Sequence, residues 1–335
     1  MALWRRSSPT TVRLVLFLSA AALALGVIFI RQHRRSSGAV DHSAEVAAVP
    51  PAAMVAPRDA PAPAAPVAAA PAPRTETVKL TARSPLLETD PPDIARARSA
   101  LARGDALTAR RIYCEALKGG LSSTAQQMVR GELIRLADGA IFSPDVLAED
   151  GLVSLYPVGR GDTLMTIARR FKITDDLILS INRIPNKDRL SVGTPLKVVK
   201  GPFRAIVTKS DFRLDVFLGE VLVRSFRAGL GTNGSTPTGR WIVRDKLRNP
   251  GWTDPRTNEY YHPDAPDNPI GEFWIGLEGV AGDAVSRRGF GIHGTIDPGS
   301  IGRQMSLGCV RLLPQDIESV FRLLVIGEST VEIVD

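Results

Sequence analysis

The feature that most restricts the fold is a stretch rich in alanine and proline at residues 36–91, which includes the run PAPAAPVAAAPAP. Such a sequence has little large apolar surface to bury, and its prolines favour extended polyproline geometry. We therefore expect a disordered linker here. The globular domains should all follow it, from residue 92 onward.

The segment before the linker, residues 1–35, has the composition of a membrane anchor or signal segment. Its uncharged run from Leu14 to Ile30 is at the lower length limit for a transmembrane helix. Small residues inside the run also allow a cleavable signal peptide, but cleavage there would leave a short apolar core, so an uncleaved anchor is preferred. Three arginines precede the run and three follow it, so charge does not set its orientation.

These six arginines account for most of the net charge of +7, and the segment holds no acidic residue. The remaining residues are close to neutral, and no basic face is visible among them. The sequence therefore argues against nucleic acid as a partner.

Helical spacing of apolar residues follows the linker at residues 92–145. Ile94, Ala97 and Leu101 mark one helical face, and Gly104-Asp105 breaks the pattern before the next helix. The run resembles a tetratricopeptide-type helical hairpin, with one unit and part of another. We expect a short α-helical (TPR-like) module for spacing or protein contact, with Cys114 as a small buried residue.

Residues 154–200 predict a small strand-helix-helix-strand unit. The first strand is expected at Tyr156–Val158, the last at Pro195–Val199, and the first helix after a Gly-Asp-Thr turn in which Asp162 would be the cap. Gly161-Asp162-Thr163-Leu164, Asn182 and Leu190-Ser191-Val192-Gly193 resemble the lysin motif (LysM), a βααβ module that binds peptidoglycan or chitin. The resemblance implies glycan contacts at the following residues: Gly161, Asp162, Thr163, Leu164, Ile184, Pro185 and Asn186. These residues could instead serve only the fold.

Alternation of apolar and polar residues begins after Pro202 and continues to residue 335. It predicts a mainly antiparallel sheet, arranged as a sandwich or a flattened barrel, with one helix beginning at Pro314. The Pro- and Asp-rich stretch 249–271 is long for a connection in a compact domain. We expect it to form a lid or a binding surface.

Two residue types that the chain uses sparingly meet in GIHGTIDPGSIGRQMSLGCVRL, residues 291–312, which contains His293 and Cys309. A thiol that attacks an amide carbonyl needs a base, because free cysteine is mostly protonated at neutral pH. It also needs backbone N–H groups for the oxyanion, and glycine lets substrate approach them. By itself this pair is a weak signal, and a buried structural histidine beside a lone thiol is the alternative.

The blocks around the pair resemble the catalytic domain of L,D-transpeptidases, the YkuD domain, over residues 202–335. The matching blocks are Gly231-Thr232, Thr236-Pro237-Thr238-Gly239, Asn249-Pro250, Asn268-Pro269-Ile270-Gly271, Trp274-Ile275-Gly276-Leu277, Ile292-His293-Gly294-Thr295 and Ser306-x-Gly308-Cys309-Val310-Arg311-Leu312. Many members carry histidine where this chain has Leu307, which removes only a side-chain contribution.

The resemblance implies that Cys309 is the acylated nucleophile and His293 its proton acceptor, oriented by the carbonyl of Gly294. The N–H groups of Leu307, Gly308 and Cys309 would line the oxyanion hole. Substrate contacts are expected from the following residues: Arg311, Ser306, Leu307, Trp252 and Trp274.

The reaction implied by the resemblance is acyl transfer between peptidoglycan stem peptides, which gives 3-to-3 cross-links through a cysteinyl thioester. Water as the acceptor would give L,D-carboxypeptidase activity, and an inert sheet domain would leave a wall-binding scaffold. Both substrates, stem peptides and glycan strands, place the folded part outside the cytoplasmic membrane, in the periplasm or cell wall of a bacterium. No cofactor or metal is expected, because His33, His42 and His262 belong to no ligand cluster.

Overall fold

The computed structural model describes residues 91–147, 149–187 and 190–335. The predicted anchor at residues 1–35 lies outside the described residues, and so does the predicted linker except for Pro91. Within the described ranges, no helix is both long enough and apolar enough to cross a bilayer.

The first elements are three helices that follow one another closely: α2 (Pro92–Ala102), α3 (Ala106–Lys118) and α4 (Ser123–Ala140). The Asp105 side chain caps α3 by accepting from Thr108 N, in the break that the sequence predicts. Buried residues of all three helices form one cluster with Leu222 of the sheet region. The helices therefore pack against the C-terminal part of the chain, and the ion pair between Arg130 and Asp215 joins the same two parts.

The predicted βααβ unit is formed by β1 (Val153–Pro157), α5 (Leu164–Phe171), α6 (Asp175–Ile181) and β2 (Pro195–Val199). The strands pair antiparallel, with Val153 opposite Val199. The first strand begins earlier than predicted, because Val153 is buried and continues the ladder.

The cap of α5 differs from the prediction. Thr163 is the N-cap and forms a capping box with Thr166, whereas Asp162 does not cap the helix. The carboxylate of Asp162 instead accepts hydrogen bonds from Tyr156 Oη (2.8 Å) and Gly159 N (2.7 Å). Asp162 thus holds the turn that precedes the helix.

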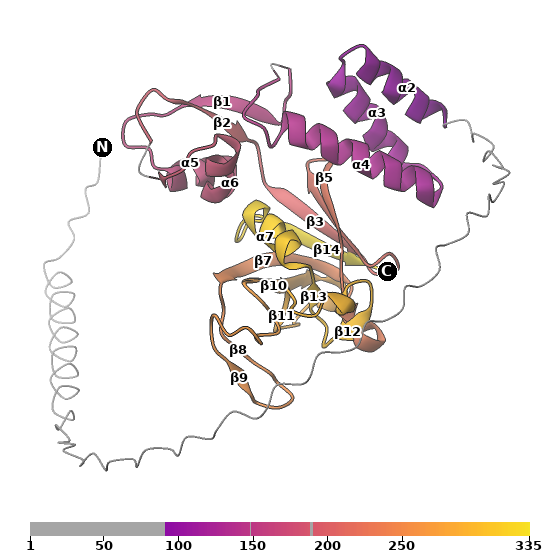
Figure 1. Cartoon of the computed structure of the whole chain (residues 1–335), viewed down its shortest axis with the longest axis vertical. Coiled ribbons are helices and arrows are strands. Elements are labelled where there is room, and N and C mark those ends of the chain that lie inside the picture. The colour runs from indigo at the N-terminus through magenta and orange to yellow at the C-terminus, as the bar shows by residue number, and fades with distance from the viewer. Residues whose placement is uncertain (1–90, 148, 188–189) are drawn as a thin grey trace, which may run out of the picture. The chain divides into compact units, whose positions relative to one another are not determined.

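The C-terminal part is built on one eight-stranded sheet with the order β13-β11-β10-β7-β14-β3-β4-β5 (Figure 1). Its strands are β3 (Phe203–Thr208), β4 (Arg213–Leu218), β5 (Val221–Arg227), β7 (Gly239–Arg248), β10 (Phe273–Ala281), β11 (Phe290–His293), β13 (Val310–Arg311) and β14 (Thr330–Val334). Two pairs are parallel, β11 with β13 and β14 with β3. The sheet is therefore mixed, although antiparallel pairs predominate as predicted.

The two ends of this strand order are joined. Gly229, which follows β5, forms an antiparallel bridge with Arg311 of β13 through hydrogen bonds of 2.9 and 2.8 Å. This is a single bridge, and the edge strands β13 and β5 form no ladder with each other. The sandwich and the flattened barrel both stay predictions.

Shorter elements surround the sheet. They are β6 (Leu230–Gly231), η2 (Thr232–Gly234), β8 (Trp252–Thr253), β9 (Tyr260–Tyr261), η3 (Gly282–Ala284), η4 (Pro298–Ser300), β12 (Gln304–Ser306) and α7 (Pro314–Leu323). β8 and β9 form a small hairpin within the stretch 249–271 that the sequence predicts to be a lid. The helix α7 begins at Pro314, as predicted.

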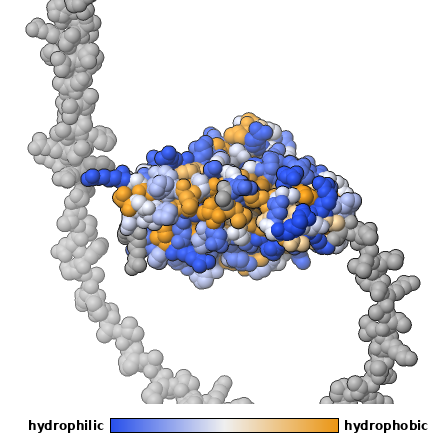
Figure 2. Space-filling view, turned by 90° about the horizontal axis from the view of Figure 1, so that it is seen from above, coloured by the Kyte–Doolittle hydropathy of each residue, from blue (hydrophilic) through white to orange (hydrophobic). Residues whose placement is uncertain are grey.

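The described residues all belong to one compact unit. A single hydrophobic cluster contains residues of α5, α6 and β2 together with residues of β3, β7, β10 and α7. The βααβ unit and the sheet thus share a core. On the molecular surface, in the face seen in Figure 2, apolar residues gather toward the middle of the view and hydrophilic residues surround them.

The side chain of Lys197 in β2 makes a buried contact with the helical module, with 1% of the residue exposed. Its Nζ donates to the carbonyls of Ala140 (2.7 Å), Ser143 (2.8 Å) and Asp145. These acceptors lie at and beyond the end of α4, where backbone carbonyls have no partner within the helix. Burial lowers the pKa of this lysine, opposed by the charges of Asp145 and Asp150.

Candidate active site

The sheet brings together the two residues that the sequence singles out. His293 ends β11, and β13 pairs with it in parallel, with Ile292 opposite Val310 and His293 opposite Arg311. Cys309 directly precedes β13, so this pairing holds it beside β11. Both side chains line one pocket.

The imidazole of His293 is held in one tautomer. The residue is 4% exposed, and its Nδ1 lies 2.6 Å from the carbonyl oxygen of Gly294. Because a carbonyl only accepts, Nδ1 must carry the proton, and Nε2 is then an unprotonated acceptor. The ring stacks on Trp274 with centroids 5.9 Å apart.

Burial lowers the pKa of His293 from 6.5 to about 4, opposed by the hydrogen bond to Gly294 and reinforced by the charge of Arg311. The side chain is therefore a neutral base at neutral pH.

The thiol of Cys309 is partly exposed to the pocket, and its Sγ lies 3.7 Å from the carbonyl oxygen of Gly289. The protein packed around it raises the pKa of the thiol, although the charge of Arg311 opposes this. The resting pair is thus a neutral thiol and a neutral imidazole. A base that accepts the thiol proton is then required for attack.

The turn before Cys309 is fixed by Ser306, which is 3% exposed. Its hydroxyl donates to the carbonyl of Cys309 (2.6 Å) and accepts from Gly308 N (3.1 Å). One of the three N–H groups that the resemblance assigns to an oxyanion hole is therefore already used inside the turn. That the N–H groups of Leu307 and Cys309 line an oxyanion hole stays a prediction.

Glycine is required at position 308. Its φ of +142° lies in the region that L residues rarely adopt. A Cβ there would lie 2.6 Å from Cε1 of Phe290 and 3.0 Å from the carbonyl oxygen of Ser235.

The pocket has a volume of about 350 Å³. Its lining residues are Trp252, Pro255, Arg256, Pro269, Ile270, Trp274, Arg288, Gly289, Phe290, His293, Met305, Ser306, Leu307, Cys309 and Arg311. The structure thus brings Trp252 and Trp274 to the same pocket as the Cys309 turn. Gly294 and Gly308 lie beside it, next to His293 and Cys309.

Two cationic residues that line this pocket were not predicted from the sequence. Arg256 forms an ion pair with Asp254 of the same loop, and the hydrogen bonds from Arg256 lower the pKa of the Asp254 carboxylate to about 2. Arg288 makes no side-chain hydrogen bond or ion pair with any residue that the structure describes. Together with Arg311, whose Nε is buried without a partner, they make three guanidinium groups and no carboxylate in the lining. Exposed loop arginines carry no periodicity or motif that would reveal them.

The predicted glycan contacts fall on two loops of the βααβ unit. Gly161 has φ +85°, Asp162 and Thr163 hold the turn before α5, and Leu164 is 5% exposed, so it serves the core. Ile184 and Pro185 line a different pocket, beside residues of α7, and Asn186 is exposed.

The other sparse residues lie away from the pocket. Cys114 is 8% exposed in α3, and burial raises the pKa of its thiol. His262 is exposed and packs edge-on against Tyr260, with ring centroids 4.7 Å apart. Among the described residues, no group of three or more His, Cys, Asp and Glu side chains could hold a metal ion.

Comparison with known proteins agrees with both resemblances. Residues 202–333 match the L,D-transpeptidase catalytic domain, and residues 156–199 match the LysM domain. YkuD of Bacillus licheniformis is 28% identical over 171 residues, which cover 49% of this chain and 88% of that protein. YkuD of Bacillus subtilis is 29% identical over 171 residues, which cover 48% and 88%.

Among solved structures, an L,D-transpeptidase from Mycobacterium tuberculosis H37Rv is 19% identical with a TM-score of 0.32. The match covers 43% of this chain and 64% of that one. At this TM-score the superposition adds nothing to the two family matches.

Proposed function

Because residues 202–333 belong to the L,D-transpeptidase catalytic domain family and residues 156–199 to the LysM family, we propose that this protein is a cysteine acyltransferase that joins peptidoglycan stem peptides. The observation that carries the proposal is the hydrogen bond between His293 Nδ1 and Gly294 O (2.6 Å), in the pocket that Cys309 lines. It leaves Nε2 as the base that a neutral thiol needs.

The first half of the reaction forms a thioester. The Cys309 thiol passes its proton to His293 Nε2 as Sγ attacks the carbonyl carbon of the diamino acid at stem position three. The tetrahedral intermediate then collapses, and the peptide bond to the terminal D-alanine breaks. Its amine leaves with the proton from the imidazolium, which returns His293 to the neutral form favoured by its low pKa.

The second half transfers the acyl group to an amine of another stem, which gives a 3-to-3 cross-link and restores the thiol. His293 accepts the proton of the attacking amine and returns it to the departing sulfur. Water in place of the amine would give a carboxypeptidase, and the apolar part of the lining, which includes Trp252, Pro269 and Ile270, favours the exclusion of water.

The charge of the pocket supports an acidic peptide as the donor. Arg256, Arg288 and Arg311 line it without any carboxylate. A stem peptide carries free carboxylates at its terminal D-alanine and along its chain, and each can accept charge-assisted hydrogen bonds from a guanidinium. We assign Arg288 to this role first, because its side chain has no partner in the described part of the chain.

The LysM domain extends the proposal to glycan strands as the second binding partner. Both substrates belong to the cell envelope, so the folded part is placed outside the cytoplasmic membrane. The run Leu14–Ile30 would then be an anchor with the N-terminus on the cytoplasmic side. An inert wall-binding scaffold is the competing function, and it predicts an unreactive Cys309.

Mass spectrometry of the full-length chain after exposure to a carbapenem or a tetrapeptide stem tests the reaction. We expect one acyl adduct on Cys309, none in Cys309→Ala, and much slower formation in His293→Ala. Cys114 is the internal control, because its buried thiol should stay unmodified. A folded wild-type chain without an adduct on Cys309 would establish the scaffold instead.

A further inference from the structure

A second pocket lies between the LysM domain and α7 of the catalytic domain. It has a volume of about 520 Å³ and is lined by Asp176, Leu179, Ser180, Arg183, Ile184, Pro185, Arg248, Glu318 and Arg322. Six of these residues come from α6 and the turn that follows it, and three come from β7 and α7. Each domain therefore supplies part of the wall.

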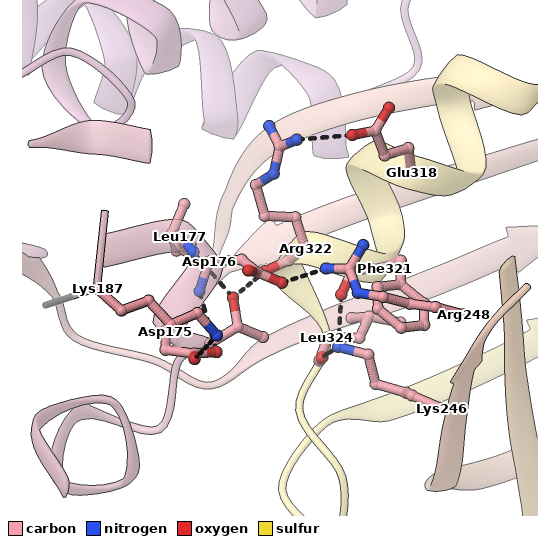
Figure 3. Close-up of polar contacts among 11 residues, drawn as sticks. Asp175, Asp176, Leu177, Lys187, Lys246, Arg248, Glu318, Phe321, Arg322 and Leu324 are labelled. Carbon is pink, nitrogen blue, oxygen red and sulfur yellow. Dashed lines mark hydrogen bonds and ion pairs between the residues drawn. The ribbon is translucent and has the colours of Figure 1, made fainter. Parts of the chain in front are cut away.

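The pocket carries an excess of positive charge. Two of its three guanidinium groups have carboxylate partners, Arg248 with Asp176 across the two domains and Arg322 with Glu318 (2.9 Å) within α7, as Figure 3 shows. Arg183 is exposed and makes no side-chain hydrogen bond or ion pair with the residues that the structure describes. One cation is thus left over for an anionic ligand.

The remaining lining suits a sugar ring. Leu179, Ile184 and Pro185 supply apolar surface for a ring face, and the Ser180 hydroxyl supplies a polar contact. The volume lies within the range of small-ligand sites. An uncharged sugar would use this surface but would leave the guanidinium of Arg183 without a counterion.

The two walls are held in place by several contacts, part of which Figure 3 shows. Thr174, the cap of α6, donates its hydroxyl proton to the carbonyl of Arg322. Lys172 pairs with Glu328 (2.9 Å), and Lys246 Nζ donates to the carbonyls of Phe321 (2.5 Å) and Leu324 (2.7 Å) at the end of α7. A ligand therefore meets a formed pocket, which reduces the entropy lost on binding.

We propose that this pocket is a saccharide subsite shared by the two domains, and that it binds a carboxylate-bearing amino sugar of a glycan strand. The apolar turn Ile184-Pro185 contacts the sugar, while Arg183 and Arg322 bind the carboxylate from the two sides. The inference rests on the proposed function, since it takes glycan strands as the partner. It adds the chemistry of the ligand and a contribution from the catalytic domain.

Titration calorimetry with the full-length chain carrying Cys309→Ala tests this subsite without consuming any ligand. Three probes separate the sources of the carboxylate. Chitotetraose is neutral, a peptide-free tetrasaccharide with muramoyl residues carries lactyl carboxylates, and a disaccharide-tetrapeptide carries stem carboxylates. We expect an acidic probe to bind about tenfold more tightly than chitotetraose, the effect of one charge-assisted hydrogen bond.

The substitutions Arg183→Gln and Arg322→Gln should each remove most of this gain and leave chitotetraose binding nearly unchanged. Arg103→Gln is the matched control, because Arg103 is an exposed arginine of the helical module. Arg322→Gln breaks only an exposed ion pair, so it should fold, and thermal unfolding checks this. Arg322→Lys, which keeps the charge, should retain part of the gain.

A gain with the peptide-free probe identifies the lactyl carboxylate of the sugar as the ligand group. A gain with the peptide-bearing probe alone would overturn the inference, because stem carboxylates are not part of the sugar. Equal affinity for all three probes would overturn the inference, and so would a gain that survives Arg322→Gln. Because the titration needs no thiol, an unreactive Cys309 would refute the proposed function without changing this result.

Discussion

The buried imidazole of His293 predicts a loss of stability in acid whose size follows from its pKa. The folded chain binds a proton there only near pH 4, whereas an unfolded chain binds it near 6.5. Between these values the unfolded state carries more protons, so the free energy of unfolding falls as the pH falls. A difference of one in pKa corresponds to about 1.4 kcal/mol. The difference between about 4 and 6.5 therefore lowers the free energy of unfolding by about 3 kcal/mol between pH 7 and pH 4.

The assay is urea unfolding of the full-length chain at pH 7, 5.5 and 4, for wild type and His293→Gln. Glutamine can still donate to the carbonyl of Gly294 but does not titrate. Other groups titrate equally in both chains, so the difference in unfolding free energy isolates the imidazole. We expect that difference to change by about 3 kcal/mol in favour of the variant from pH 7 to pH 4. Parallel pH dependences would refute the burial argument.

The same low pKa sets the acid limit of the reaction. In the proposed reaction neutral His293 is the base, so the rate of Cys309 acylation by a carbapenem should be nearly level from pH 7 to pH 5 and should fall only near pH 4. Stopped-flow kinetics measures this profile. A midpoint near 6.5 would mean that the imidazole is solvated in the working enzyme.

Three further changes probe the pocket and the packing. Gly308→Ala forces a Cβ to 2.6 Å from the ring of Phe290, and misplacement of the neighbouring thiol should slow acylation about 100-fold by mass spectrometry. Arg288→Gln removes one charge-assisted hydrogen bond, so steady-state kinetics should show KM for a tetrapeptide stem rising about tenfold with a smaller change in kcat. Lys197→Met leaves three carbonyls without their donor and should cost about 3 kcal/mol in urea unfolding, whereas exposed Lys200→Met should cost little.

Local patterns in the sequence predict the small βααβ unit closely, because each of its elements is marked by its own apolar spacing and by turn or capping residues. The bounds of its last strand, Pro195–Val199, agree with the prediction. The prediction of Asp162 as the cap of α5 was wrong, because Asp162 and Thr163 are both residue types that commonly cap helices. In the structure the hydroxyl of Tyr156 donates to the carboxylate of Asp162, so this side chain is not used as the cap. That contact forms only when the chain is folded.

The order of the sheet could not be predicted from alternation. The last strand, β14, inserts between β7 and β3, and a single bridge pairs Gly229 with Arg311. Both pairings join segments that are distant in sequence, and alternation reports only which face of a strand is buried. For the same reason the sequence predicts the helical module as a spacer or contact module, without showing that Leu222 packs into it.

For the candidate site, the sequence indicates the turn around Cys309 because a glycine precedes the cysteine. Gly308 has φ +142°, which residues other than glycine rarely adopt. Arg256 and Arg288 come from two loops that are distant in sequence, and only the fold brings their charges together. The engagement of Gly308 N by Ser306 likewise follows from the shape of the turn.

The core that the LysM domain shares with the sheet has a consequence for how far the protein can reach. Two modules on a flexible tether search a sphere, and any stem within that radius can react. Here packed side chains of a shared core fix the distance from Ile184 to the sulfur of Cys309. With the proposed function and the proposed subsite, the protein would react only with a stem that lies at one fixed distance along the strand from the bound sugar.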